Sequence, residues 1–206
     1  MKYIFVAGAP GSKWSSVVKN IYYSPNIDRS DYSDARTYYH DASGQRELMH
    51  LGAYFDPGME FGQTFHRLSM YDKATLEKDF DEPFSGRGIR IVKSHTFANH
   101  IDHLKTLWPE CPVVLVHRDD DACLGWWVKC GHFDITYPSY DYYFQDFKTM
   151  AQRIKQENSG IINARLKYSG SSPIDNLGLA GILGIEPPPE EYSQNYGQSD
   201  VRVTVI

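Results

Sequence analysis

The stretch Tyr3-Ile4-Phe5-Val6-Ala7, followed directly by Gly8-Ala9-Pro10-Gly11-Ser12-Lys13, decides the expected fold. The first part is an apolar run of the length of a strand, and the second part is a glycine-rich turn. Residues 14–22 then follow with the spacing of a helix. A strand, a tight turn and a helix in this order predict the start of an α/β domain.

Further apolar runs along the chain predict more strands at 89–93, 113–117 and 161–166. The run Val113-Val114-Leu115-Val116 is apolar at every position, as expected of a strand covered on both faces, so we expect it in the middle of the sheet. Helical stretches alternate with these runs, which indicates parallel strands joined by crossover helices. The expected fold class is therefore α/β, a three-layer sandwich with a central parallel sheet, similar to P-loop NTPases.

The helical pattern predicts helices at 14–22, 59–71, 97–107, 120–130, 140–156 and 174–183. Residues 26–58 have no clear periodicity and are interpreted as an insertion or binding loop. Residues 187–206 are interpreted as a C-terminal tail whose final part, Val201-Arg202-Val203-Thr204-Val205-Ile206, alternates like an edge strand. The length of 206 residues fits a single domain over 1–206.

The formal net charge of −5 argues against a general nucleic-acid binder, because phosphate backbones require a broad basic surface. Any anionic ligand must then be held by a local group of cations. Cys111, Cys123 and Cys130 are odd in number and have no C-x-x-C spacing, which argues against a disulfide framework and a zinc ribbon. Reduced thiols, no signal-peptide pattern and no apolar run of membrane-spanning length lead us to expect a cytoplasmic protein without a membrane partner.

The turn Gly8-Ala9-Pro10-Gly11-Ser12-Lys13 has the context of an anion site. Between a strand and a helix, successive backbone N–H groups converge on an anion, and the helix N-terminus adds a favourable dipole. We therefore expect phosphate binding at this turn. The alternative is an ordinary turn with a solvated lysine.

The same turn departs from the P-loop of nucleoside-triphosphate enzymes. In that motif the lysine is followed by a Ser or Thr that ligates magnesium, whereas here Trp14 takes that place and the spacing is one residue short. These departures weaken a prediction of magnesium-dependent phosphoryl transfer. The acidic run 119–121 keeps a small-molecule or nucleotide kinase as the alternative function.

Two other strand ends carry side chains suited to chemistry. Lys93-Ser94-His95 supplies a base, and His117-Arg118 supplies an anion-binding cation. Ligands of α/β proteins gather at such strand ends. The alternatives are a structural, hydrogen-bonded His95 and an Arg118 paired with Asp119, Asp120 or Asp121.

Together these segments resemble sulfotransferases that use 3′-phosphoadenosine 5′-phosphosulfate. That family has a P-loop-like fold, a turn similar to P-K-S-G-T-T-W, a K-T-H segment and a strand ending in Arg. Here the similar segments are Pro10-Gly11-Ser12-Lys13-Trp14-Ser15-Ser16, Lys93-Ser94-His95 and Val114-Leu115-Val116-His117-Arg118. Their order and spacing match the family over about residues 2–132.

The resemblance implies that a sulfuryl group moves from this donor to an acceptor hydroxyl or amine, without a metal. His95 would be the general base, Lys13 would stabilise charge on the bridging oxygen, and Lys93 would orient the donor or the base. Pro10, Gly11, Ser12, Trp14, Ser15 and Ser16 would surround the 5′-phosphate, and Arg118 would bind the 3′-phosphate. The acceptor would be a small molecule or a carbohydrate.

Three departures from the family pattern support a third interpretation, a binding protein that has lost catalysis. Lysine and glycine are exchanged within the turn, and Trp126 stands where the family has a serine eight residues after the arginine. An indole N–H cannot reproduce a hydroxyl, so Trp126 is expected to pack against adenine or the core. The family's C-terminal basic loop has no match beyond Arg202.

Two other groups of residues have ordinary explanations. His95, His100 and His103 invite a zinc interpretation, but no further ligand follows from their spacing, so no metal site is expected. The dense aromatic stretch 137–147 is interpreted as core packing, because Tyr140, Phe144 and Phe147 recur at helical spacing. The alternative is an aromatic platform for the acceptor.

Overall fold

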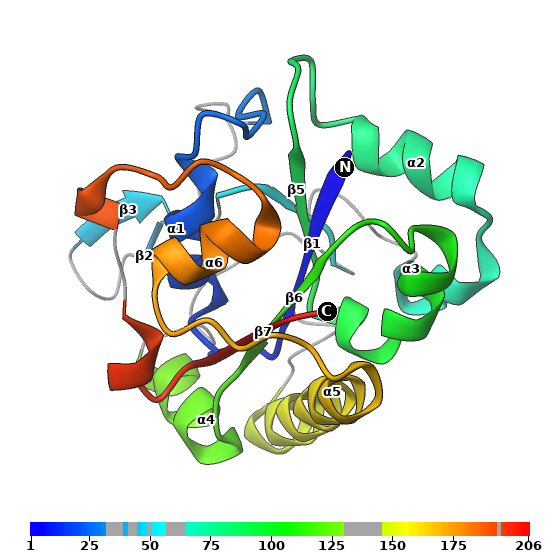
Figure 1. Cartoon of the computed structure of the whole chain (residues 1–206). Helices are drawn as coiled ribbons and strands as arrows, with labels where there is room; N and C mark the ends of the chain where they lie inside the picture. The colour runs from blue at the N-terminus through cyan, green and yellow to red at the C-terminus, as the bar shows by residue number, and fades with distance from the viewer. Residues whose placement is uncertain (32–38, 41–44, 49–50, 57–64, 130–145, 193–194) are drawn as a thin grey trace.

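The computed structural model describes residues 1–31, 39–40, 45–48, 51–56, 65–129, 146–192 and 195–206 (Figure 1). Its centre is a five-stranded sheet in the order β4-β5-β1-β6-β7. The strands are β1 (Tyr3–Gly8), β4 (Ala53–Tyr54), β5 (Arg90–Lys93), β6 (Val113–His117) and β7 (Arg202–Val205). The first four strands of that order pair in parallel, and β7 pairs antiparallel with β6.

The central position of the sheet belongs to β1, so the prediction that β6 lies in the middle is wrong by one place. Strand β6 is still paired on both sides and buried at every position, which explains its uninterrupted apolar sequence. The predicted edge strand at the end of the chain is confirmed as β7.

The segment 26–58 is only partly a loop. It contributes β4 to the edge of the main sheet, beside β5. It also contains a separate antiparallel pair of β2 (Tyr39–His40) and β3 (Gln45–Leu48). Strands this short lack the alternating pattern that reveals longer ones, and the sequence therefore did not indicate them.

The helices partly follow the prediction. Helices α1 (Trp14–Tyr22) and α4 (Asp120–Lys129) occupy the expected positions, and α6 (Asn176–Leu183) begins two residues late, after its Asp175 cap. The predicted helix 97–107 is divided into the 3₁₀ helix η4 (Thr96–Asn99) and α3 (Ile101–Leu107).

Part of the predicted helix 59–71 lies outside the described residues, and its described part contains the 3₁₀ helix η3 (Phe65–Met70). Helix α2 (Lys73–Asp81), which starts at the capping residue Asp72, was not predicted.

The strand predicted at 161–166 is wrong, because these residues belong to the long helix α5 (Phe147–Tyr168). Ile161 and Ala164, three residues apart, are buried, whereas Leu166 is 77% exposed, which is a helical pattern. The helix begins after Asp146, whose side chain accepts a hydrogen bond from the N–H of Thr149. The start predicted at 140 lies outside the described residues.

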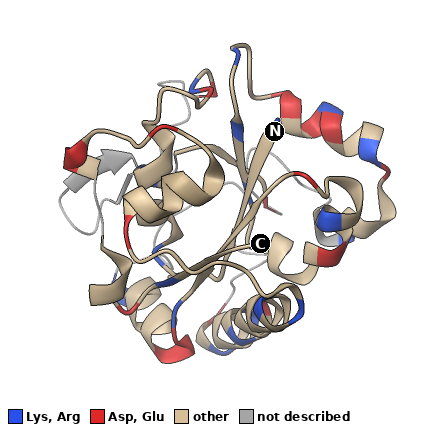
Figure 2. Ribbon diagram, in the orientation of Figure 1, with Lys and Arg blue, Asp and Glu red and all other residues tan. Residues whose placement is uncertain are grey.

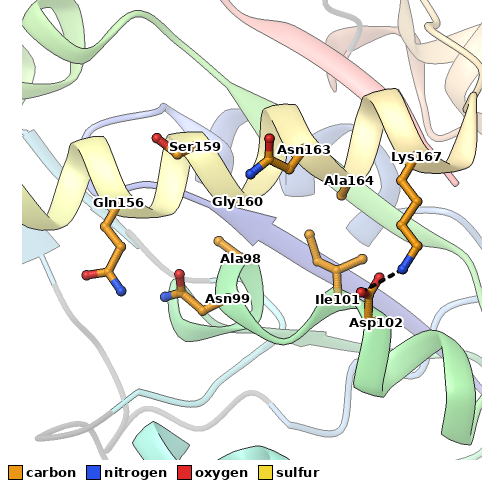
Figure 3. A pocket seen from close by; sticks show the side chains of 10 residues that line it. All are labelled: Ala98, Asn99, Ile101, Asp102, Gln156, Ser159, Gly160, Asn163, Ala164 and Lys167. Carbon is orange, nitrogen blue, oxygen red and sulfur yellow. Dashed lines mark hydrogen bonds and ion pairs between the residues drawn. The ribbon is translucent and has the colours of Figure 1, made fainter.

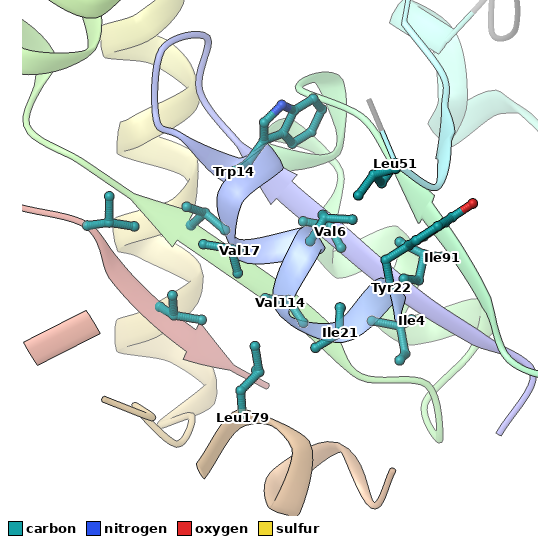
Figure 4. Close-up of a cluster of buried hydrophobic side chains, with 14 of the residues drawn as sticks. Ile4, Val6, Trp14, Val17, Ile21, Tyr22, Leu51, Ile91, Val114 and Leu179 are labelled. Atoms are coloured by element: carbon teal, nitrogen blue, oxygen red, sulfur yellow. The ribbon is translucent and has the colours of Figure 1, made fainter. Parts of the chain in front are cut away.

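Two buried clusters cover the two faces of the sheet. One joins the β1 residues Ile4 and Val6 to side chains of α1 and α6 (Figure 4). The other joins Tyr3 and Phe5 of the same strand to α2, η4 and α3. Helix α5 contributes to both, and the expected α/β fold with a mostly parallel sheet is confirmed. Within the described ranges, no helix combines the length and apolar character needed to cross a bilayer.

Candidate functional site

The turn after β1 is a tight bend that packs against α4. The Ser12 N–H donates to the Ala9 carbonyl, 3.0 Å away, and Gly11 has a φ of 78°. A Cβ at Gly11 would lie 2.1 Å from the carbonyl oxygen of Cys123, so both the backbone conformation and the close approach require glycine. The absence of a side chain at Gly11 therefore allows α4 to pack directly against the turn.

Lys13 occupies the N-cap position of α1 with a left-handed backbone, φ 62° and ψ 25°. A non-glycine residue there is strained by roughly 1–2 kcal/mol. No acceptor for the backbone amides of Gly11 and Lys13 is found in the described part of the chain. These amides and the α1 N-terminus form the kind of surface that binds anions.

The other predicted residues of the turn differ in accessibility. The Ser12 side chain is fully buried, and its hydroxyl has no hydrogen-bond partner among the described residues, so it faces the interior and not a ligand on the turn surface. Pro10 and Trp14 are also buried, Ser15 is half-buried and Ser16 is exposed. The expected contact of the Ser12 hydroxyl with a phosphate is therefore not available in this conformation.

Two cations from different strand ends converge on one carboxylate. The Lys13 Nζ lies 3.5 Å from Asp200 Oδ1, and Arg118 Nε and Nη2 each lie 2.5 Å from Asp200 Oδ2. Arg118 also donates from Nη1 to the Gly11 carbonyl at 3.2 Å, which ties it to the turn. The pairing considered for Arg118 with Asp119, Asp120 or Asp121 is wrong, because its carboxylate partner is Asp200.

Trp126 lies beside the same two cations. Its ring centroid is 5.0 Å from Lys13 Nζ and 5.8 Å from Arg118 Cζ, and the side chain is half-buried. These distances are typical of cation–π contacts, which orient the two cations against the ring face. The position predicted from the family pattern is thus part of the site, through an aromatic face in place of a hydroxyl.

The segment Lys93-Ser94-His95 forms the second half of the site. The Lys93 side chain is fully buried, and its Nζ lies 5.4 Å from the Trp14 ring centroid and 5.8 Å from that of Tyr54. The His95 ring stacks on Trp14, with centroids 4.0 Å apart and planes 17° apart, and meets Tyr54 edge-on. Trp14, which stands where P-loop enzymes have a Ser or Thr hydroxyl, therefore packs against the ring of the predicted base.

His95 is joined to the turn by a hydrogen bond from its Nδ1 to the Gly8 carbonyl oxygen. A carbonyl only accepts, so Nδ1 carries the proton and Nε2 carries the free lone pair of the neutral ring. Burial lowers the pKa of His95 below its ordinary value, and the neighbouring Lys93 lowers it further, while Asp56 opposes the shift. The imidazole is consequently neutral, which is the form that accepts a proton.

Asp56 fixes the backbone around His95. Its Oδ1 accepts from the Ser94 hydroxyl at 2.8 Å and from the Thr96 hydroxyl at 3.1 Å, and its Oδ2 accepts from the His95 N–H at 3.2 Å. Asp56 lies two residues after the end of β4 and is itself buried. The edge strand that the sequence did not indicate is thus what positions the predicted base.

The structure brings together the turn, Lys93, His95, Arg118 and Trp126 at the carboxyl ends of β1, β5 and β6. Asp200, Asp56 and Tyr54 were not expected in the site. Asp200 gives no local signal in the sequence of the tail, because its contact with Lys13 depends on how β7 pairs with β6.

The three histidines considered for a metal do not form a shared site, and the described ranges contain no group of three potential metal ligands.

The aromatic stretch 137–147 lies almost entirely outside the described residues. Its last member, Phe147, is 58% exposed, so the expected core packing is wrong at that position. Phe147 is the first residue of α5.

A groove of about 340 Å³ runs between α5 and the η4–α3 segment (Figure 3). Its floor is the close contact between Gly160 and Ala98, where a Cβ on Gly160 would lie 2.2 Å from the Ala98 carbonyl oxygen. The ion pair of Lys167 and Asp102 closes one end, with 2.7 Å between Nζ and Oδ2. Lys167 is the one cation among the lining residues of the groove, whereas two cations meet at the turn, so the groove is the weaker anion site.

Comparison with known proteins gives no further assignment, since no family model, curated protein or solved structure matches this chain.

Proposed function

We propose that the protein is a sulfotransferase that moves a sulfuryl group from 3′-phosphoadenosine 5′-phosphosulfate to an acceptor hydroxyl or amine. The observation that carries the proposal is the convergence of Lys13 and Arg118 on the Asp200 carboxylate, beside the turn and the Trp126 ring. Two cations aimed at one oxyanion form a site in which a phosphate oxygen can replace the carboxylate. The P-loop-like fold is part of the same proposal, supported by the central position of β1.

The proposed chemistry assigns the cations to the donor. A bond forms between sulfur and the acceptor oxygen or nitrogen while the S–O bond to the 5′-phosphate breaks, and negative charge grows on the departing phosphate oxygen. Lys13, with the free amides of the turn, would stabilise that charge. Arg118 would hold the 3′-phosphate through its planar fork, with Trp126 beside it.

His95 would take the proton that the acceptor loses. Its Nε2 has the free lone pair, because Nδ1 donates to Gly8, and burial keeps the ring neutral. The proton passes from the acceptor oxygen or nitrogen to Nε2, and the imidazolium charge is then balanced in part by Asp56. Lys93 would help to orient the ring through the shared aromatic wall of Trp14 and Tyr54.

The experiment that tests this proposal is calorimetric titration with 3′-phosphoadenosine 5′-phosphate, with and without magnesium, and with ATP in parallel. Saturable binding without magnesium, weakened at least tenfold in Lys13→Ala and in Arg118→Ala, is expected. Lys78→Ala is the matched control, because it removes one exposed cation on α2, away from the site. Equal binding in wild type and both site variants would refute the proposal, and a preference for magnesium-ATP would favour the kinase.

Asp200 also supports a second candidate, a binding protein without catalysis, because a carboxylate of the chain already fills the anion site. The two candidates differ at His95. For a sulfotransferase, His95→Asn should reduce kcat by about 10²- to 10⁴-fold while donor binding is retained. An unchanged biological activity of the His95→Asn protein would support the binding protein.

The cytoplasmic location is likewise a proposal. It rests on Cys111 and Cys123, which are buried and free, as expected of thiols kept reduced.

A further inference from the structure

A separate pocket lies beside the edge strand β7. It has a volume of about 190 Å³ and lies between the C-terminal part of α5, β7 and the 3₁₀ helix η7 (Tyr196–Gln198). Its lining includes the apolar residues Pro173, Ile174, Val201 and Val203, of which the two valines are buried and Ile174 is exposed. Small-molecule sites combine an apolar lining with a few polar groups that point into the same space.

The polar side of the pocket is formed by Arg165 of α5 and Arg202 of β7. Neither guanidinium has a carboxylate partner among the residues that the structure describes. The two positive charges therefore face one pocket without compensation. An oxyanion bound between them would relieve their repulsion and accept from both planar forks.

His117 lies close to these two arginines. It pairs with Arg202 in the β6–β7 register, so the two side chains lie on the same face of the sheet. Its Nδ1 is buried and has no hydrogen-bond partner in the described part of the chain. Burial lowers the pKa of His117, and Arg202 and Arg165 lower it further, while Asp119 and Asp120 act in the opposite sense.

Helix α5, which lines the pocket through Arg165, is basic overall. Between 147 and 168, α5 carries five basic residues, Lys148, Arg153, Lys155, Arg165 and Lys167. Its one acidic residue, Glu157, is fully buried, and burial raises the pKa of that carboxyl well above its usual value. Figure 2 shows these basic positions as blue segments of the α5 ribbon. On a chain with a net charge of −5, this concentration is local.

We propose that this pocket binds a small oxyanion carrying a short apolar group, such as a phosphate monoester. Arg165 and Arg202 would contact the oxyanion, and the exposed side chain of Ile174 would contact the apolar group. The site is distinct from the one formed by Lys13 and Arg118. It does not depend on sulfuryl transfer, since none of its residues belongs to that machinery.

The test is calorimetric titration with phenyl phosphate and with inorganic phosphate, in a Lys13→Gln background that weakens the other anion site. Phenyl phosphate should bind saturably and more tightly than inorganic phosphate, because only the ester carries an apolar group that can contact Ile174. Arg165→Gln and Arg202→Gln should each weaken phenyl phosphate by about tenfold or more, as expected when a charge-assisted hydrogen bond is lost.

Lys155→Gln is the matched control. This substitution removes one positive charge from the same helix, ten residues or about 15 Å before Arg165. The Lys155→Gln protein should bind phenyl phosphate with unchanged affinity. Melting temperatures should agree among the variants, because neither arginine has an ion-pair partner in the described ranges. Absence of binding, or equal affinity in all these proteins, would overturn the site. Equal affinity for the two ligands would overturn the apolar part of the proposal.

Discussion

Arg118 donates from Nε to one oxygen of Asp200, which lies 82 residues later in the chain, and its Nη2 forms an ion pair with the same oxygen. The pair joins the carboxyl end of β6 to the segment that leads into β7. The Asp200 side chain nevertheless remains 45% exposed. A partly solvated carboxylate on two cations is an internal competitor for any anion that binds there.

Asp200→Asn should increase the affinity for 3′-phosphoadenosine 5′-phosphate about two- to fivefold. The reason is that an exposed ion pair contributes about 0.2–1 kcal/mol, which the incoming phosphate would no longer have to displace. Calorimetry on the variant and the wild type measures the change. Asp121→Asn, which removes one exposed charge from the first turn of α4, should have no comparable effect. Weaker binding by Asp200→Asn would mean that Asp200 helps to hold the ligand.

His95 should titrate below its ordinary value of about 6.5, because burial disfavours the imidazolium. In the unfolded chain His95 protonates near 6.5, so the unfolded state binds more protons just below that pH. The free energy of unfolding should therefore fall as the pH falls through this range. A pH series of imidazole NMR spectra, assigned with His95→Asn, measures the pKa directly. Titration at or above 6.5 would contradict this prediction.

Gly11→Ala should destabilise the fold by roughly 1–3 kcal/mol, because the new Cβ would meet the Cys123 carbonyl in a left-handed conformation. Gly125→Ala is the matched substitution in α4, where a Cβ meets nothing within 4 Å. It should stabilise the protein by about 0.5–1 kcal/mol, since alanine is the better helix former. Urea denaturation distinguishes the two. Similar effects of both substitutions would show that the turn does not require glycine.

Glu157→Gln should stabilise the protein by an amount that grows with pH. The Glu157 carboxyl is fully buried, and its oxygens have no hydrogen-bond partner among the described residues. Burial and the charge of Asp56 raise its pKa well above the usual value, while Arg153 opposes the shift. The unfolded chain ionises near pH 4.3, so the wild type loses stability above that pH and the amide does not. Thermal unfolding at pH 4 and pH 8 should show a small and a larger difference. A difference independent of pH would contradict this account.

The sequence predicted the parts of the fold that have strong local patterns. The apolar runs of β1 and β6, and helix α1 after the turn, are placed as expected. It failed at 161–166, where an apolar run fits a strand or a buried helix equally well and only the contacts of Ile161 and Ala164 decide. Strand β4 is too short to show any period.

The residues of the candidate site likewise include some that the sequence predicted and some that it did not. The turn, Lys93, His95 and Arg118 were found because each lies at the end of a predicted strand. Asp56 and Asp200 were not found, because they reach the site only through the pairing of β4 and β7 at the two edges of the sheet. The burial of the Ser12 hydroxyl was not predicted, because the sequence of a tight turn does not show which of its side chains point inward.

The antiparallel pairing of β7 with β6 has a consequence for biosynthesis. Ribosomes release a chain from its N-terminus, so β6 emerges more than eighty residues before the strand that covers its free edge. During that interval the backbone groups of β6 on that side have no β7 partner, and an unpaired apolar strand is a template for aggregation. The nascent chain therefore has reason to engage chaperones until β7 leaves the exit tunnel.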